Sequence, residues 1–350
     1  KYQPCPAAMG GGASIQPVEA GETYDIKKGQ MMVKEADLGK DLSGKVAVIT
    51  GASGGIGFCT CEQLCRQGCK VVMLARNMKL LEEKAAQLQG LKGEAVTLPL
   101  DLADLASVRE AAKAILEKVD RIDFLVNNAG VMNCPKGATK QGFEMQIGVN
   151  HFGHFVLTEL LMPTLQKSAP SRVVVLASCA HFVIQKAQGR IDLEDLHFQK
   201  KPYHGWRAYA QSKLANVLHA VELQKRYGDK GVTTVSLHPG FVDTDLLRHT
   251  VPSMTKMVSG PILRGKGIIP VWPGTQTSLY CILADDVTNH GGKFFSQANS
   301  PGGSAGFMYE DKQLQKGGWP MAEIPNPIGR DAELATKFYD HSLEAVKEFL

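Results

Sequence analysis

The sequence lacks any uninterrupted apolar run close to the ~18 residues that a membrane-spanning helix needs. It also lacks a block of like charges, because the formal net charge is only +4 and basic residues are interspersed with acidic ones. The first absence indicates a protein that is soluble or at most peripheral to a membrane. The second argues against the basic surface that nucleic-acid-binding proteins carry. We therefore expect no transmembrane segment and no nucleic-acid partner.

A disulfide scaffold is also missing, although the chain contains eight cysteines. Cys59, Cys61, Cys65 and Cys69 fall in one short segment, and the last three are spaced to share one helical face. A metal or redox site needs thiolates that converge on a point, whereas small apolar thiols suit a helix packed against a sheet. Packing is the favoured interpretation, so we predict no metal site and a reducing compartment.

The chain shows no internal repeat and no clear linker between domains. Its 350 residues are 44% hydrophobic and 21% charged, which is ordinary for one large globular domain. Residues 1–42 start at Lys1, are rich in glycine and polar residues, and are predicted to form an N-terminal extension. They are either the remainder of a processed organelle precursor or a trimmed end. We expect a plastid or mitochondrion after removal of a presequence, with the cytoplasm as the alternative.

Short apolar segments alternate with helical patterns along most of the chain. Strands are predicted at residues 45–50, 70–75, 94–100, 122–126, 172–177, 232–237 and 292–296. Strands that are apolar throughout are buried on both faces, as in a parallel sheet covered by helices. The sequence therefore predicts an α/β doubly wound Rossmann fold over residues 43–300. Its parallel sheet has about seven strands with helices on both faces, and ligands bind at the carboxyl ends of the strands.

A glycine-rich motif, Thr50-Gly-Ala-Ser-Gly-Gly-Ile-Gly57, lies where the first strand passes into a helix. Gly51 permits the tight turn, Gly55 lets the backbone approach a pyrophosphate, and Gly57 permits close packing of helix and strand. The start of the helix would offer unpaired N–H groups to the anion. The alternative is a glycine-rich turn without a ligand. The strand and helix on either side favour a nucleotide site.

Tyr209 and Lys213 are four residues apart in a predicted helix from Gly205 to about Tyr227, so their side chains share one face. A cation beside the phenol would lower its pKa from ~10 towards the range useful for proton transfer. By itself the pair also fits an ordinary surface turn of a helix. The surrounding motifs therefore decide its interpretation.

With both motifs present, the chain resembles the short-chain dehydrogenase/reductase family over about residues 43–300. Asn127-Asn-Ala-Gly130 is similar to the family motif that supports the sheet and the adenosine, and His238-Pro-Gly240 with Thr244 is similar to its nicotinamide-side loop. Three strings look like the branch of retinol dehydrogenases and WW-domain oxidoreductases, with protochlorophyllide reductase more distant. They are Val149-Asn-His-Phe-Gly-His-Phe155, Tyr209-Ala-Gln-Ser-Lys-Leu-Ala-Asn216 and Gly292-Lys-Phe-Phe-Ser296.

The resemblance implies a catalytic tetrad of Asn150, Ser178, Tyr209 and Lys213. Tyr209 would donate a proton while the nicotinamide supplies hydride, Lys213 would lower the tyrosine pKa and hold the ribose, and Ser178 would orient the substrate oxygen. Asn150 would fix a water linking Lys213 to solvent. The residues expected to bind the cofactor are Thr50, Gly51, Ser53, Gly54, Gly55, Ile56, Gly57, Arg76, Asn77, Asp101, Leu102, Asn128, Ala129, Gly130, Tyr209, Lys213, Pro239, Gly240, Val242 and Thr244.

The end of the second strand indicates which cofactor is used. An NAD site places an acid there for the ribose 2′-hydroxyl, whereas a cation suits the 2′-phosphate of NADP. This chain has Arg76, with Asn77 beside it and Lys79 nearby, so we predict NADP(H). The alternative is a surface arginine at a strand end. Asp101 ends the third strand and is expected to accept from the adenine amino group, with an N-cap of the next helix as the alternative.

The substrate is indicated only by apolar residues. The resemblance implies that about residues 241–275 form a lid, and the segment 251–272 carries Met254, Met257, Val258, Ile262, Leu263, Ile268, Ile269 and Trp272. They favour an apolar carbonyl or alcohol, such as a retinoid, steroid, lipid aldehyde or pigment intermediate. A lid that packs only on its own core is the alternative.

Residues 301–350 are predicted to form a C-terminal extension that ends in an amphipathic helix. The apolar face comprises Leu334, Phe338, Ala345, Val346 and Phe349. Docking on the fold is the expected arrangement, with contact to another subunit or to a membrane surface as alternatives.

Three hypotheses of function follow. The first is an NADPH-dependent carbonyl reductase or alcohol dehydrogenase, favoured by the complete tetrad. The second is a nucleotide-binding accessory subunit of a larger complex. The third is a reductase of C=C bonds that resembles protochlorophyllide reductase. His151, His154, His181 and Cys179 are expected to be buried rather than catalytic.

Overall fold

Eight strands form one sheet in the order β10-β9-β8-β5-β4-β1-β2-β3. The computed structural model describes residues 33–184, 187–246, 269–296, 321–322, 324 and 326–350. The strands are β1 (Val46–Thr50), β2 (Lys70–Ala75), β3 (Glu94–Pro99), β4 (Phe124–Asn127), β5 (Ser171–Leu176), β8 (Val232–His238), β9 (Phe294–Ser296) and β10 (Met321–Ala322). The first seven pair in parallel, which confirms the predicted doubly wound fold. The antiparallel edge strand β10 was not predicted.

Both faces of the sheet are covered, as β1 illustrates. All five of its residues are buried. Val46 and Val48 belong to one hydrophobic cluster, while Ala47 and Ile49 belong to another. Successive side chains of a strand point to opposite faces, so a strand buried on both sides must be apolar at every position. This burial explains the continuous apolar runs in the sequence.

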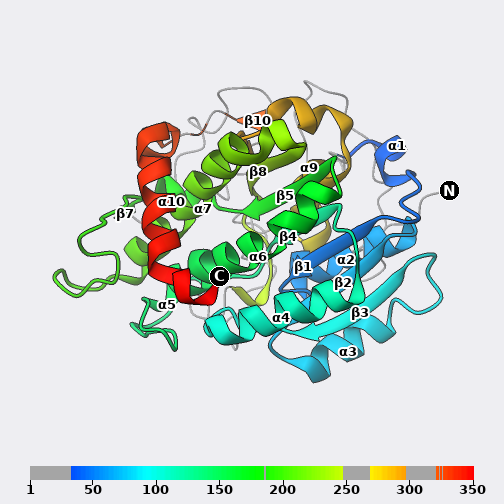
Figure 1. Cartoon of the computed structure of the whole chain (residues 1–350), viewed down its shortest axis with the longest axis horizontal. Helices are drawn as coiled ribbons and strands as arrows, with labels where there is room; N and C mark the ends of the chain where they lie inside the picture. The colour runs from blue at the N-terminus through cyan, green and yellow to red at the C-terminus, as the bar shows by residue number, and fades with distance from the viewer. Residues whose placement is uncertain (1–32, 185–186, 247–268, 297–320, 323, 325) are drawn as a thin grey trace.

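The helices divide between the two faces (Figure 1). On one side lie α1 (Glu35–Leu38), α2 (Gly55–Arg66), α3 (Met78–Ala86) and α9 (Val271–Leu283). On the other lie α4 (Leu105–Lys118), α6 (Gly153–Lys167) and α7 (Gly205–Tyr227), preceded by the short α5 (Met145–Ile147) and one π-helical turn (Gly148–Phe152). A small antiparallel hairpin, β6 (Val183–Ile184) and β7 (Ala187–Gln188), lies between β5 and α7 in the chain.

The terminal helix α10 (Ala332–Val346) packs along α7, which confirms that it docks on the fold (Figure 1). The ring of Phe338 lies 4.7 Å from that of His151, and the Tyr339 ring lies 5.0 Å from Phe155. The Arg226 guanidinium stacks 4.0 Å from the centre of the Tyr339 ring. Ala345, which was predicted on the apolar face, is exposed.

Part of the predicted N-terminal extension packs against the same domain. Val33, Leu38 and Leu42 are buried in the cluster that contains α2 and α9. The Gln67 side chain donates hydrogen bonds to the carbonyl oxygens of Asp37 and Lys40 at 2.8 and 3.1 Å. Residues 1–32, the predicted lid residues 247–268 and residues 301–320 lie outside the described part of the chain.

The clustered cysteines pack in the core. Cys59, Cys61, Cys65 and Cys69 are all buried, and none of the four is in a disulfide bond. The prediction that Cys69 shares a helical face was wrong, because α2 ends at Arg66. Burial raises the pKa of Cys61 and Cys69 and raises that of Cys65 to about 12, so these thiols stay protonated at neutral pH. Among the described residues, no group of three or more His, Cys, Asp or Glu is placed to hold a metal ion.

Membrane-spanning helices are absent from the described ranges. None of the helices resolved there combines the length and the apolar character needed to cross a bilayer.

Buried neutral histidines should make the fold sensitive to acid. Burial lowers the pKa of His154 and His181 to about 4 and of His219 and His238 to about 3. Each regains a pKa near 6.5 on unfolding, so the unfolded chain binds more protons below that pH. The free energy of unfolding should therefore fall as the pH drops from 6.5 towards 4, by ~1.4 kcal/mol per pH unit for each histidine.

Thermal denaturation at pH 7.5 and pH 5.0 measures this effect. We expect a Tm at least ~10 °C lower at pH 5.0, since a few degrees correspond to each kcal/mol in a domain of this size. Glu144 and Glu159, whose pKa values burial raises, act in the opposite direction and offset part of the loss. Equal melting temperatures at the two pH values would contradict the assignment of these histidines as neutral.

Candidate functional site

The turn between β1 and α2 can be built only from glycine at three positions. Gly51 and Gly55 have φ angles of +67° and +52°. A Cβ atom at Gly57 would lie 2.4 Å from the carbonyl oxygen of Gly51. Gly54 precedes α2 without a side-chain cap among the described residues. The first N–H groups of α2 therefore face outward unpaired, which favours an anion at this position.

Thr50 joins the carboxyl ends of β1 and β4. Its hydroxyl oxygen accepts hydrogen bonds from the backbone N–H groups of Asn128 and Ala129, both at 2.9 Å. The Asn128 side chain donates to the carbonyl oxygen of Thr50 at 2.6 Å. These bonds hold residues 128–130 against the glycine-rich turn.

Asn150 lies in the π-helical turn and is fully buried. Its side-chain oxygen accepts from the Val131 N–H at 2.8 Å, and its side-chain nitrogen donates to the Val131 carbonyl and to the Ser212 hydroxyl, both at 2.9 Å. The side chain thus fastens the loop after β4 to α7. The water expected between Asn150 and Lys213 stays a prediction.

Ser178, Tyr209 and Lys213 converge beyond the carboxyl end of β5. Tyr209 and Lys213 lie on one face of α7 and are 3% and 4% exposed. The Ser178 hydroxyl is hydrogen-bonded to the Tyr209 phenol. The Lys213 ammonium donates to the carbonyl oxygen of Leu176 at 2.8 Å and lies 5.8 Å from the centre of the Tyr209 ring.

Burial dominates the electrostatics of this group. It raises the pKa of Tyr209 above its usual value, although the Ser178 hydrogen bond acts in the opposite direction. Burial also lowers the pKa of Lys213 to about 7. The prediction that Lys213 lowers the pKa of Tyr209 does not hold in this structure, because desolvation of the phenol outweighs a cation that is itself destabilised by burial. The phenol therefore keeps its proton at neutral pH.

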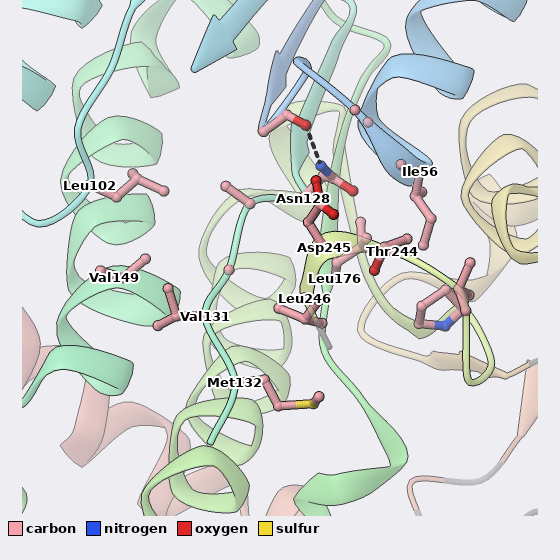
Figure 2. Close-up of a pocket in the computed structure, with 18 of the residues that line it drawn as sticks. Ile56, Leu102, Asn128, Val131, Met132, Val149, Leu176, Thr244, Asp245 and Leu246 are labelled. Atoms are coloured by element: carbon pink, nitrogen blue, oxygen red, sulfur yellow. Dashed lines mark hydrogen bonds between the residues drawn. The ribbon is translucent and has the colours of Figure 1, made fainter. Parts of the chain in front are cut away.

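These groups share one cavity of about 570 Å³ at the carboxyl ends of the strands. Figure 2 shows part of its wall, including Ile56, Asn128 and Val131. Every residue predicted for catalysis or cofactor binding lines it except Thr50 and Asn150. Those two lie behind the wall and hold it through Asn128, Ala129 and Val131. The structure therefore brings the predicted residues together, and their individual functions remain predictions.

An apolar region beside Tyr209 was not predicted. Met132, Phe241 and Leu246 line the cavity and belong to the same apolar cluster as Tyr209 and Trp206, and Figure 2 shows Met132 and Leu246 near each other. Phe241 and Leu246 fall within the predicted lid. Ile269 and Trp272, also predicted for the lid, are each 2% exposed and pack in the main core instead. The other predicted lid residues lie outside the described chain.

Comparisons with known proteins agree with this geometry. The family model for short chain dehydrogenases matches residues 45–190. Human retinol dehydrogenase 13 is 39% identical over 300 residues, covering 83% of this chain and 86% of its own. Bovine retinol dehydrogenase 12 is 42% identical over 258 residues, covering 73% and 78%. The chain belongs to the short-chain dehydrogenase family. Within it, this dehydrogenase lies in the retinol dehydrogenase-like branch and is an NAD(P)-dependent oxidoreductase.

Solved structures show the same fold. An uncharacterised protein of Mycobacterium paratuberculosis superposes with a TM-score of 0.66 at 32% identity, covering 88% of this chain and 95% of its own. RhlG of Pseudomonas aeruginosa, solved as an active-site complex with NADP, gives a TM-score of 0.58 at 23% identity over 73% of this chain and 95% of its own.

In the dehydrogenase, Arg76 directly follows the last residue of β2. This side chain is exposed, lines the cavity, and forms no ion pair with another described residue. Asn77 beside it also lines the cavity, but its side-chain oxygen accepts from the Leu80 N–H at 3.1 Å and caps α3. Arg76 is therefore the group with uncommitted donors at this strand end, in accord with the predicted position of the 2′-phosphate.

Asp101 also lines this part of the dehydrogenase cavity. Its side chain accepts from the Ala103 N–H at 3.0 Å. The alternative prediction, an N-cap of the following helix, was wrong because Asp104 caps α4 by accepting from the Ala106 N–H. The hydrogen bond from the adenine amino group to Asp101 stays a prediction.

The C-terminal segment of the dehydrogenase supports the loop of Ser178. The buried Asn326 side chain donates to the carbonyl oxygens of His181 and Gly189 at 2.6 and 2.9 Å. The His181 ring nitrogen Nδ1 in turn bonds to the Ser178 carbonyl oxygen. Sequence reasoning missed Asn326, because an isolated asparagine carries no pattern that indicates a partner 145 residues away.

Proposed function

We propose that this dehydrogenase uses NADPH to reduce the carbonyl group of an apolar substrate, with Tyr209 as the proton donor. One observation carries the proposal: the buried phenol of Tyr209 lines the same cavity as the glycine-rich turn and the apolar residues Met132, Phe241 and Leu246. Reduction of a carbonyl needs a proton donor beside the carbonyl oxygen, and a phenol in this position can supply that proton.

The residues present fit the cofactor. A side chain at Gly55 would need a strained backbone, and its Cβ would lie 3.0 Å from a methyl carbon of Thr244, so glycine leaves this space for a pyrophosphate. Lys213 uses one of its three N–H groups on Leu176, and the other two suit ribose hydroxyls. Arg76 suits the 2′-phosphate through its planar donors. When bound, NADPH supplies the hydride.

The proton step follows from Ser178 and Tyr209. Both hydroxyls donate to the substrate carbonyl oxygen, which gains negative charge as its carbon receives hydride. The Tyr209 O–H bond then breaks, and the proton completes the alcohol. The ammonium form of Lys213 stabilises the resulting phenolate until solvent returns a proton.

The substrate class follows from the cavity wall. Met132, Phe241 and Leu246 offer an adaptable apolar surface beside the phenol. The curated relatives are named retinol dehydrogenases, which supports a retinoid among the candidates, together with steroids and lipid aldehydes.

Oxidation of NADPH, followed by absorbance, tests the proposal on the full chain with all-trans-retinal, a steroid ketone, a long-chain aldehyde, an apolar enone and a small polar aldehyde. We expect kcat/KM for at least one large apolar carbonyl to exceed that for the polar aldehyde by ~100-fold or more, since each additional buried methylene contributes ~0.8 kcal/mol. Saturation of the enone C=C bond would favour C=C reduction. NADPH binding without turnover on any compound would favour an accessory subunit.

A further inference from the structure

His154 is buried behind the cavity wall and connects the glycine-rich turn to the turn of Asn150. The ring lies in the first turn of α6 and is 2% exposed. Its Nδ1 atom lies 3.1 Å from the Asn150 backbone carbonyl oxygen, and its Nε2 atom lies 2.9 Å from the Thr50 hydroxyl oxygen. Both ring nitrogens are therefore engaged, one on each side.

The partners determine where the ring proton resides. A carbonyl oxygen only accepts, so Nδ1 must carry the proton and donate to Asn150. Burial lowers the pKa of His154 to about 4, so the ring is neutral and its Nε2 is an acceptor at neutral pH. The Thr50 hydroxyl must then donate to Nε2.

The bonds of Thr50 lead to the same arrangement. A hydroxyl has one donor and two acceptor positions, and both acceptors are taken by the N–H groups of Asn128 and Ala129. A proton on Nε2 would direct a third donor at the same oxygen and would leave Nδ1 facing the carbonyl of Asn150. The other acceptor near the hydroxyl is the Val126 carbonyl oxygen, at a longer distance of 3.4 Å.

His154 therefore orients the hydroxyl that holds the cavity wall. Without the bond to Nε2, the Thr50 hydroxyl proton would turn towards Val126, and its lone pairs would no longer point at residues 128 and 129. The other end of the wall is held by the Asn150 side chain at Val131. The His154 ring is thus bonded to both residues that hold the segment 128–131, namely Thr50 and Asn150. All four residues of this segment line the cavity.

We propose that His154 is a positioning residue for cofactor binding, which holds the wall of residues 128–131 through the Thr50 hydroxyl and the Asn150 carbonyl. This inference rests on the proposed function, because it assumes that NADPH occupies the cavity. His154 lies behind the wall and acts through Thr50 and Asn150.

Two variants with a carboxamide side chain distinguish the two hydrogen bonds of the His154 ring, one to Thr50 and one to Asn150. The longer side chain of His154→Gln can bring an oxygen to the Thr50 hydroxyl. In His154→Asn the amide can donate to Asn150 but is too short to reach Thr50. His219→Asn is the matched control, since His219 is also 2% exposed and neutral but packs against Phe155 and Tyr339, away from the cavity. NADPH binding is titrated by fluorescence at 25 °C, after circular dichroism has shown that each variant is folded.

We expect His154→Asn to raise the Kd for NADPH by ~10-fold, as loss of a buried hydrogen bond of 1–2 kcal/mol implies. His154→Gln should stay within ~3-fold of wild type, and His219→Asn within ~2-fold, even where each lowers Tm. In steady state, KM for NADPH should rise more than kcat falls in His154→Asn, because Tyr209 and Ser178 are held by other contacts. If His154→Asn does not fold, His154→Leu takes its place, because it fills a similar space without either hydrogen bond and should weaken NADPH binding at least as much.

Equal NADPH affinity in wild type and in His154→Asn, or in its replacement His154→Leu, would overturn the proposal, and so would an equal loss in His219→Asn. Failure of wild type to bind NADPH would instead overturn the proposed function, so the two failures are distinguishable.

Discussion

Tyr209→Phe should lower kcat by ~10³-fold while leaving the Kd for NADPH within about twofold of wild type. The substitution removes the phenolic proton that the proposed reduction requires, and general acid catalysis commonly accounts for 10²–10⁴-fold in rate. The phenylalanine ring keeps the apolar contacts of Tyr209 with Met132 and Trp206. Steady-state NADPH oxidation with the best carbonyl substrate measures kcat, and a fluorescence titration measures the Kd for NADPH.

Tyr227→Phe is the matched control for this substitution. Tyr227 is the last residue of α7 and bonds to Glu159 at 3.5 Å, outside the cavity. Tyr227→Phe removes the same hydroxyl group, and its kcat should equal that of wild type. Retained turnover in Tyr209→Phe would refute the assignment of Tyr209 as the acid, and an equal loss in both variants would show that the effect is not specific to the site.

Arg76→Asp should reverse the cofactor preference. The substitution removes the cation proposed for the 2′-phosphate and places a carboxylate where an NAD site has one. Charge-assisted hydrogen bonds contribute ~1.5–3 kcal/mol, so we expect kcat/KM for NADPH to fall by ~100-fold or more. The value for NADH should stay constant or rise, because the new carboxylate can accept from the ribose 2′-hydroxyl.

Lys79→Asp makes the same change of charge three residues further along the chain. Lys79 is exposed at the start of α3 and does not line the cavity. The ratio of kcat/KM for NADPH to that for NADH should therefore change by less than ~3-fold in Lys79→Asp. Steady-state kinetics with both cofactors measures all three proteins. An unchanged ratio of NADPH to NADH activity in Arg76→Asp would contradict the assignment of NADP(H).

The central sheet could be predicted because burial on both faces leaves a direct trace in the sequence. The predicted strands coincide with β1, β2, β3, β5 and β8 to within one residue at each end. The edge strand β10 and the β6–β7 hairpin have two residues in each strand, which is too short for a period to be visible. The helix α9 begins inside the predicted lid and was not predicted. The glycines and prolines before it obscured the helical pattern of its apolar residues.

The polar parts of the site were predictable because backbone geometry demands particular residues there. Gly51 and Gly57 are required by a positive φ angle and by a close carbonyl contact, so the motif is visible as glycines. The apolar wall of Met132, Phe241 and Leu246 follows no such constraint, since several apolar residues fill the same volume. Its assembly from distant segments appears only in the folded chain.

In the structure without cofactor, the shift in the pKa of Tyr209 is opposite to the one expected from Lys213, for a physical reason. Spacing along a helix places Lys213 beside the phenol but says nothing about desolvation, and α7 is buried along most of its length. Desolvation raises the pKa of the phenol and lowers that of Lys213 to about 7. In the site without cofactor, burial therefore favours the neutral form of both side chains.

The most direct test of NADPH-dependent carbonyl reduction follows the transferred hydrogen itself. The protein is incubated with NADPH deuterated at C4 of the nicotinamide and with the preferred apolar aldehyde, and the product is examined by mass spectrometry and NMR. We expect one deuterium on the former carbonyl carbon of the alcohol with wild type and almost none with Tyr209→Phe. Deuterium at a former C=C carbon, or no transfer by wild type to any carbonyl of the panel despite bound NADPH, would contradict the proposed function.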